Sequence, residues 1–439
     1  MNKKRNVRRV VEWGKNVLIV LLSCSAVWLA ARSQMFGPVQ EIWQEEDQQV
    51  GPVQTQSGER VDAARPLRVT ANIVGSAETL RHGIQYDTAA SDALFQQTAG
   101  LLAEALSSAG APEQIFRSQW ERALLTAPGI SFDFQGELPM PVLVGWLTGE
   151  DTGLNAVVRR MILTVWQDDV AVYYRDEESG QYYRCLSDVA NQAHLTEGLS
   201  ALSDNGAGYA FESEPYRNLD PDTLVTNVPS SCAVYTAVNA MSGGRGALEE
   251  LMGDLGMSVD ASSFYSSGDE QVARSGNDSI RLSARGVAEY RAGESSDQFV
   301  VSVRRDISLF ETVEACRQLA AATVGARCDQ ARIYLMSAQE SAQGLEVRFG
   351  YCLNGSMVRL EEGYAARFLV QNGQITQFDL RFRSYSDSGK AETVLPFRQA
   401  AAAMTAMGLE KEELLLMYND TGADTVAAGW AAAGAVGEG

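Results

Sequence analysis

Residues 364–383 read YAARFLVQNGQITQFDLRFR and form the best-defined local pattern of the chain. Two alternating apolar runs flank Asn372-Gly373, a dipeptide typical of a tight β-hairpin turn. The pattern therefore predicts two antiparallel strands with one largely apolar face. That face has to be buried against another element, so the hairpin sets the organisation of the residues around it.

Two registers are compatible with this hairpin. A two-residue turn at Asn372-Gly373 pairs Val370 with Ile375, but it puts Phe378 on the opposite face from Phe368. A three-residue loop, Gln371-Asn372-Gly373 with Gly373 left-handed and bulged, gathers the apolar side chains on one face, so we predict the bulged loop. The residues of that face are Tyr364, Ala366, Phe368, Val370, Phe378, Leu380 and Phe382.

The predicted cover for this face is a helix over residues 396–407 that stops at Gly408 and carries Phe397, Ala401 and Met404 on one side. Upstream, the pattern predicts a helix at 309–323 and strands at 299–303, 331–337, 345–353 and 356–360. Together these elements define a third α+β domain at 299–418. The Ala- and Gly-rich residues 419–439 are predicted to be a low-complexity tail.

Two further α+β units are predicted before residue 299. The first domain, 66–213, contains strands near 67–71, 130–134, 160–166, 170–175 and 181–185, with helices along 94–105, from Pro112, and over 187–202. The second domain, 214–298, begins with a Pro-bearing connection. It continues with a helix that ends at Gly256 and a meander at 271–274, 279–283 and 287–290. The polar residues 37–65 are predicted to be a flexible tether.

The N-terminal residues 1–36 carry a basic end followed by an apolar run, VLIVLLSCSAVWLAA at 17–31, between Lys15 and Arg32. The run is short for a bilayer but can span it if the flanking cations snorkel. Six basic residues precede it against Glu12, which predicts a cytoplasmic N-terminus and extracellular later domains. A cleaved signal peptide, a lipoprotein with its lipid on Cys24 and a buried helix are the alternatives. The cleavage site lacks small residues and the run stays apolar after Cys24, so an uncleaved anchor is favoured.

The predicted fold class is therefore α+β: a single N-terminal transmembrane helix followed by a multi-domain extracellular region of antiparallel sheets packed with helices. The predicted localisation is the cell membrane, crossed once. Small residues within the span, Ser23, Ser25 and Ala26, would permit close contact with another transmembrane helix, although they also occur in simple anchors.

The charge balance excludes one class of partner. The chain has 36 Lys+Arg and 56 Asp+Glu, and the first 31 residues hold six basic and one acidic residue, which leaves 30 against 55. Such an acidic surface repels phosphate backbones, so nucleic acid is not an expected partner. Acidity of this kind is also what keeps an extracellular protein soluble.

The side chains needed for catalysis or metal binding are sparse. After the span the chain has five cysteines, at 185, 232, 316, 328 and 352, with no C-x-x-C pair. This favours neither a disulfide framework nor a zinc site. Cys316 lies on the apolar side of its helix and is expected to be buried. One pair, Cys316 or Cys328 with Cys352, could oxidise outside the cell, and the sequence does not decide between oxidised and free thiols.

Histidine and lysine are equally rare, since only His82, His194, Lys390 and Lys411 follow the span, none of them in a nucleophile or metal motif. Asp133 and Glu137 could serve as a glycosidase pair, but a solvated strand explains them better. Gly243-Gly244-Arg245-Gly246 could form an anion nest, but it lacks the ending of a phosphate loop, which favours a plain helix entry. We expect no catalytic residues, no metal and no small-molecule cofactor.

Several stretches resemble the YycH family of two-component-system regulators: LRVTANI at 67–73, ISFDFQGELP at 130–139 and SIRLSARGVAEY at 279–290. The segments GYAARFLVQNGQITQFDLRFRSYS and VLPFRQAAAAM resemble the strand–turn–strand–helix unit that YycH shares with its relative YycI. The resemblance covers roughly residues 10–420 and rests on hydrophobic motifs.

The resemblance implies a non-enzymatic regulator that contacts a sensor histidine kinase in the same membrane and adjusts its signalling in cell-wall metabolism. A YycI-like sister protein is a further partner that it implies. Two alternatives remain open. The last unit also resembles PepSY-type inhibitory domains, which would make this chain a regulator of an extracellular protease, and a carboxylate-based wall hydrolase is the enzyme alternative.

Overall fold

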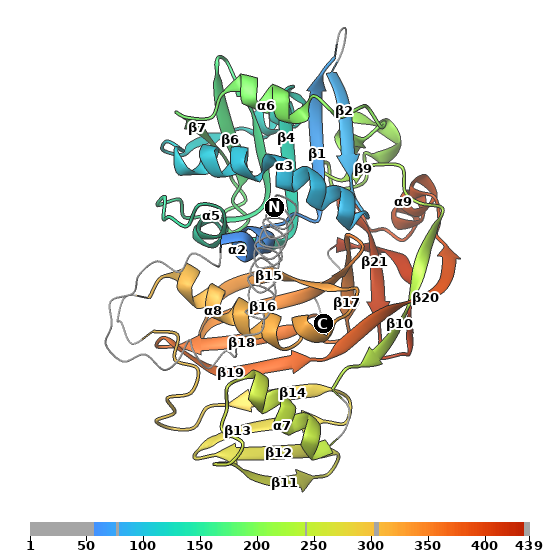
Figure 1. The fold of residues 1–439 in the computed structure, drawn as a ribbon. Helices are drawn as coiled ribbons and strands as arrows, with labels where there is room; N and C mark the ends of the chain where they lie inside the picture. Colours follow the sequence, from blue (N-terminus) through green and yellow to red (C-terminus); the bar gives the residue numbers. More distant parts are fainter. Residues whose placement is uncertain (1–56, 76–78, 242–243, 303–306, 434–439) are drawn as a thin grey trace, which may run out of the picture.

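The computed structural model describes residues 57–75, 79–241, 244–302 and 307–433. It consists of two antiparallel sheets, each packed with helices, and a group of C-terminal strands beside them (Figure 1). The expected mixture of antiparallel sheets and helices is confirmed for these residues. The predicted anchor, the tether up to residue 56 and Gly243 of the glycine-rich stretch lie outside them.

The first sheet is antiparallel throughout and carries helices on both faces. Helices α3 (Thr88–Ser107) and α6 (Gln192–Leu199) cover one face, and α4 (Arg117–Leu125) packs on the other against Ile162 and Tyr173. The strands, in spatial order, are β2 (Thr79–Ile84), β1 (Arg68–Val74), β4 (Gly129–Pro139), β5 (Val157–Trp166), β6 (Asp169–Arg175), β7 (Tyr182–Ser187) and β3 (Glu113–Ile115). The helix predicted from Pro112 begins at Arg117 instead, because the residues before it pair with β7 as β3.

The second sheet contains the meander and the hairpin together. Helices α7 (Gly244–Asp254) and α8 (Leu309–Ala322) pack against it, and α8 begins at a capping box between Ser308 and Glu311. In spatial order the strands are β11 (Ser263–Ser267), β12 (Glu270–Ser275), β13 (Asp278–Ser283), β14 (Val287–Arg291), β19 (Gln374–Arg381), β18 (Ala366–Gln371), β16 (Gly344–Leu353) and β15 (Arg332–Ser341). Because β14 pairs with β19, this sheet runs across the boundary predicted at residues 298 and 299.

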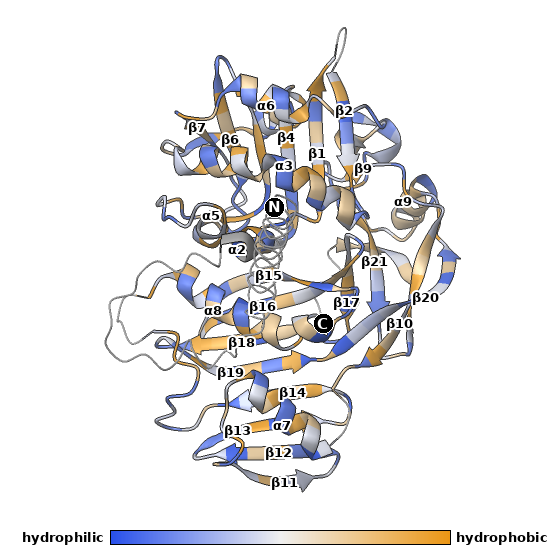
Figure 2. Cartoon of the chain, in the orientation of Figure 1, coloured by the Kyte–Doolittle hydropathy of each residue, from blue (hydrophilic) through white to orange (hydrophobic). Residues whose placement is uncertain are grey.

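The hairpin of β18 and β19 has the register that we rejected. Gln371 pairs with Gln374 and Val370 with Ile375 across a two-residue turn, in which Asn372 and Gly373 have φ of 50° and 76°. A bulge inside β19 then passes over Thr376 and restores the pairing of Phe368 with Phe378. The predicted loop is wrong, but the predicted apolar face exists, and Figure 2 shows apolar residues along both strands of the hairpin. An extra residue in the strand brings the apolar side chains onto one face just as an extra residue in the loop would.

The cover of this face is α8 and not the helix at 396–407. Helix α9 (Phe397–Ala406) instead buries Phe397 and Met404 against Leu414 and Ala432, residues of the C-terminal strands. The prediction failed because both helices are amphipathic, and an apolar stripe does not identify its partner.

Residues 414–432 are ordered strands where we expected a low-complexity tail from 419 onward. Trp430 packs against Phe397 and Tyr86, and its indole donates to the carbonyl of Leu395. These C-terminal strands are joined to the second sheet through β17 and lie beside a long two-stranded ribbon. The elements are β21 (Leu414–Asp420), β22 (Thr425–Val426), β23 (Ala428–Ala432), β17 (Ser356–Leu360), β10 (Ser231–Asn239) and β20 (Arg383–Thr393).

Residues 57–65 are likewise folded, contrary to the predicted tether. Helix α2 (Ser57–Ala63) packs against α5 (Met140–Thr148), Ala64 is fully buried, and Arg65 pairs with Asp92. The remaining short elements are β8 (Gly208–Tyr209), β9 (Leu224–Val225), and 3-10 turns at Ala210–Glu212, Glu214–Tyr216 and Gly325–Arg327.

Candidate functional site

The two sheets meet at a junction that has an apolar part and a charged part. In the apolar part, helix α5 of the first sheet lies against α8 of the second, and β4 crosses β15 at Glu137 and Ser337. Two glycines permit this approach. A Cβ on Gly136 would lie 2.0 Å from the carbonyl oxygen of Leu335, and a Cβ on Gly145 would lie 2.4 Å from the Phe310 ring.

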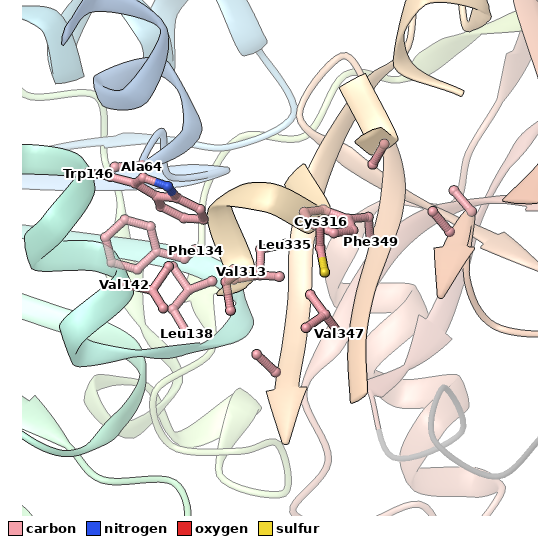
Figure 3. Close-up of a cluster of buried hydrophobic side chains, with 14 of the residues drawn as sticks. Ala64, Phe134, Leu138, Val142, Trp146, Val313, Cys316, Leu335, Val347 and Phe349 are labelled. Atoms are coloured by element: carbon pink, nitrogen blue, oxygen red, sulfur yellow. The ribbon is translucent and has the colours of Figure 1, made fainter. Parts of the chain in front are cut away.

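Figure 3 shows how side chains from the two halves interlock in the apolar part of the junction. Phe134, Leu138, Val142 and Trp146 come from the first half, and Val313, Cys316, Leu335 and Phe349 come from the second. Their packing makes one continuous core, which predicts that the halves behave as one body.

A buried hydrogen bond also crosses the apolar part. The indole Nε1 of Trp146 donates to Glu314 Oε2 over 2.9 Å, and Arg317 donates to the same carboxylate over 2.7 and 2.8 Å. Burial alone would raise the pKa of Glu314, but Arg317 and Trp146 outweigh it and hold that pKa below its usual value. The indole of one half therefore satisfies an ionised acid of the other.

The charged part is a cluster of five side chains, Arg68, Asp133, Arg159, Arg160 and Glu413, which we call the junction cluster. Arg68 comes from β1, Asp133 from β4 and the adjacent arginines from β5. Glu413 immediately precedes β21 of the C-terminal strands, which β17 joins to the second sheet and which therefore belong to the second half. Glu413 accepts hydrogen bonds from Arg68 and Arg159 at 2.5 Å and forms an ion pair with Arg160 at 2.8 Å. Asp133 lies 2.7, 3.2 and 3.0 Å from the same three arginines. Each carboxylate thus binds all three guanidinium groups.

Because the cluster is buried, its ion pairs determine whether the two acids are ionised. The side chains of Arg68 and Glu413 are each only 3% exposed, and that of Asp133 is 13% exposed. Burial opposes ionisation of both acids, yet Arg159, Arg160 and Arg68 together lower the pKa of Glu413 to about 2 and that of Asp133 still further. Both acids are therefore ionised at neutral pH.

This ionisation weighs against the glycosidase pair considered for Asp133 and Glu137. The lowered pKa of Asp133 excludes it as the general acid of such a pair, and its burial against three arginines leaves it no access to a substrate as the nucleophile or base. Glu137 accepts from Gln339 Nε2 over 2.7 Å at an exposed position. The solvated-strand interpretation is also wrong for Asp133, because that strand position faces three arginines.

A second layer of charge extends the junction cluster. Asp222 accepts from Arg117 over 2.6 Å and from the indole of Trp120 over 3.1 Å. A cavity of about 30 Å³ lies between this layer and the junction cluster, lined by Arg68, Trp120, Tyr209 and Asp222 among others. It is far smaller than the 300 Å³ or more of ordinary ligand pockets, so it has no room for a substrate.

The residue types expected for catalysis lie apart from one another. His82 on β2 donates to the carbonyl of Ser203, with Nδ1 2.7 Å from the oxygen, and His194 is exposed on α6. Lys390 is exposed on β20, and Lys411 donates to the carbonyl of Arg217. Within the part of the chain that the structure describes, no group of three His, Cys, Asp or Glu side chains could hold a metal ion.

All five cysteines after residue 57 are free thiols, so the oxidised pair considered above is not formed. Cys316 is fully buried, as predicted, and burial raises the pKa of its thiol beyond the ordinary range. Of these five described cysteines, Cys232 alone is partly exposed.

Sequence reasoning missed the junction cluster, although one signal for it was present. Arg159 and Arg160 interrupt an otherwise apolar strand, VVRRMILTVW, and charges in a buried strand require buried partners. Nothing local pointed to Glu413, which lies 345 residues from Arg68.

The predicted transmembrane contact residues, Ser23, Ser25 and Ala26, lie outside the described residues. Among the helices that the structure does describe, none is both long enough and apolar enough to cross a bilayer.

Comparison with known proteins identifies a similar fold. No family model matches the chain, and no curated protein matches its sequence. Among solved structures, the fold is similar to that of YycH from Bacillus subtilis, with a TM-score of 0.52 and 10% sequence identity over 85% of this chain and 94% of that chain. At this identity the similarity concerns the fold.

Proposed function

We propose that this chain is a membrane-anchored extracytoplasmic regulator that binds a sensor histidine kinase and adjusts its signalling in control of cell-wall metabolism. The observation that carries the proposal is the extent of the similarity to YycH, which covers 94% of that chain and 85% of this one. The sequence motifs that resemble the YycH family fall on β1, β4, β13, β14 and the β18–β19 hairpin.

The site chemistry is consistent with a binding role. The junction cluster is a buried, ionised polar site of the described residues. Its side chains form ion pairs between the two halves. Such a cluster stabilises an arrangement of elements and offers no proton donor for acid catalysis. This chemistry fits a non-enzymatic regulator, and we also propose a YycI-like sister protein as a second partner.

The test is crosslinking of the full-length protein in its native membrane, followed by identification of the captured proteins. A matched variant replaces residues 17–31 with an unrelated apolar span of the same length. Capture of a sensor kinase that depends on the native span supports the regulator and places a contact in the membrane. Capture of a secreted protease by both versions, with no kinase, would overturn the proposal in favour of a PepSY-like inhibitor.

A further inference from the structure

Strand β11 forms an open edge of the second sheet. It pairs with β12 on one side, and it lies at the end of the sheet in Figure 1, where no other described strand pairs with its second edge. Its sequence, SFYSS, contains no charge, no proline and no bulge, which are the usual devices that block pairing at an edge. Most of its residues are exposed, with Tyr265 at 44%.

The turn that joins β11 to β12 fixes which backbone groups face outward. Ser267 pairs with Glu270 across the two-residue turn Gly268-Asp269, where Gly268 has φ of 65°. In such a hairpin the closing pair is hydrogen-bonded, and the bonding direction alternates along the strand. Ser263, Tyr265 and Ser267 therefore bond to β12, whereas the N–H and C=O groups of Phe264 and Ser266 point away from the sheet.

We propose that this edge pairs with the β11 edge of a second copy of the chain, in antiparallel register about a two-fold axis at Tyr265. In this register Phe264 lies opposite the copy's Ser266, and each such pair exchanges two backbone hydrogen bonds. Tyr265 meets its own counterpart at a non-hydrogen-bonded position, where Cα atoms are about 4.5 Å apart and side chains are closest. Aromatic pairs at such positions are favourable.

The side chains beside the edge suit a second copy. Tyr265 lies next to Val272 of β12, so the axis is crossed by an apolar row of Val, Tyr, Tyr and Val. A second row of side chains lies on either side of the axis. In it, Arg274 of β12 lies next to Ser263, Ser263 lies opposite the copy's Ser267, and the copy's Glu270 lies next to that serine. Each side row therefore has an arginine at one end and a glutamate at the other. Their opposite charges favour this register only weakly, because three strand spacings, about 14 Å, separate them and Glu270 also lies 3.8 Å from Arg281 of its own chain.

A pair of five-residue strands buries much less than the roughly 1,000 Å² of a stable interface. We therefore expect a reversible dimer that forms at high local concentration, and the test must trap it. In the full-length chain, Tyr265→Cys should yield a disulfide-linked dimer on mild oxidation, because the paired Cα distance lies in the range that a disulfide accepts. Wild type gives the background from the native cysteines.

The register supplies its own controls. Ser263→Cys alone should give no dimer above background, since its counterpart lies four residues away along the strand, about 13 Å. A mixture of Ser263→Cys and Ser267→Cys chains should crosslink to each other. Adding Ser266→Pro to Tyr265→Cys removes two outward hydrogen bonds per dimer and should weaken dimerisation roughly tenfold or more, whereas Ser266→Ala should not.

Unchanged thermal unfolding of the Ser266 variants would show that each remains folded. Crosslinking of Tyr265→Cys at background level would overturn the proposal. So would equal crosslinking by Ser263→Cys alone, which would indicate random collisions, or a Ser266→Pro chain that still crosslinks in full.

Discussion

Replacing Glu413 with glutamine tests whether the junction cluster holds the two halves together. The substitution keeps the shape of the side chain but removes the charge that three arginines share at 2.5 to 2.8 Å. Asp133 is then the only acid left in the cluster to balance Arg68, Arg159 and Arg160. Removing one partner of a buried ion pair costs about 3–5 kcal/mol, and we expect the lower end because Arg159 and Arg160 keep some contact with water.

The lowered pKa of Glu413 gives a similar magnitude for the free energy of unfolding that the carboxylate contributes. Its fall from 4.5 to about 2 corresponds to roughly 3 kcal/mol of stabilisation of the ionised form in the folded protein. Because the junction cluster joins both halves, we treat the roughly 370 described residues as one unit. An unfolding entropy of about 2.1 cal/mol/K per residue then converts this loss into a decrease in Tm of roughly 4 °C.

The assay is scanning calorimetry at pH 7 on the detergent-solubilised full chain. Glu410→Gln is the matched control, since it removes an exposed carboxylate three residues away and should change the stability by less than about 0.5 kcal/mol. If Glu413→Gln and Glu410→Gln melt together, the cluster contributes nothing to the junction and the reasoning fails.

Three further predictions concern acid, packing and thiols. The folded pKa of Glu413 lies below its unfolded value, so its stabilisation is complete above about pH 4.5 and is lost as the pH falls towards 2. The difference in Tm between wild type and Glu413→Gln should therefore shrink over that interval, and a constant difference would contradict the assignment. Gly145→Ala should destabilise the protein by about 1–3 kcal/mol in urea unfolding because its Cβ meets the Phe310 ring, whereas Gly100→Ala, with open space around it in α3, should be neutral or stabilising. Among the thiols after residue 57, a thiol reagent should label Cys232 first in the folded protein and the four buried ones only after denaturation, as followed by peptide mass analysis.

The sequence predicted the local elements better than their partners. The strand at 356–360 and the helix from residue 309 are observed almost as predicted, because the features that define them act within a few residues, as the capping box between Ser308 and Glu311 in the structure illustrates. The predicted hairpin register was wrong at one point. A bulge at Thr376 aligns the apolar face in the structure, whereas we predicted that a bulged loop would do so. Periodicity alone cannot distinguish these two solutions.

The candidate site was harder to predict than the fold. Asp133 alternates with buried residues along β4, so the pattern alone placed it on a solvated face. Its surroundings depend on Arg68, 65 residues earlier, and on Glu413 near the other end of the chain. Only the tertiary fold brings these charges together. Glu413 lies within the predicted third domain, but nothing in the sequence around it indicated these partners.

The chemistry of the junction also determines how the two halves can move. Opening it would expose the Trp146–Glu314 bond and the apolar contacts of α5 with α8, and it would separate Glu413 from three guanidinium groups at once. A small displacement would break the close ion pairs of these charged side chains without exposing them to much water. Partial opening is therefore unfavourable. The glycines at 136 and 145 add close backbone and ring contacts that tolerate little sliding. The closed junction therefore favours one rigid body, in which a partner bound to either sheet acts on the whole described part of the chain.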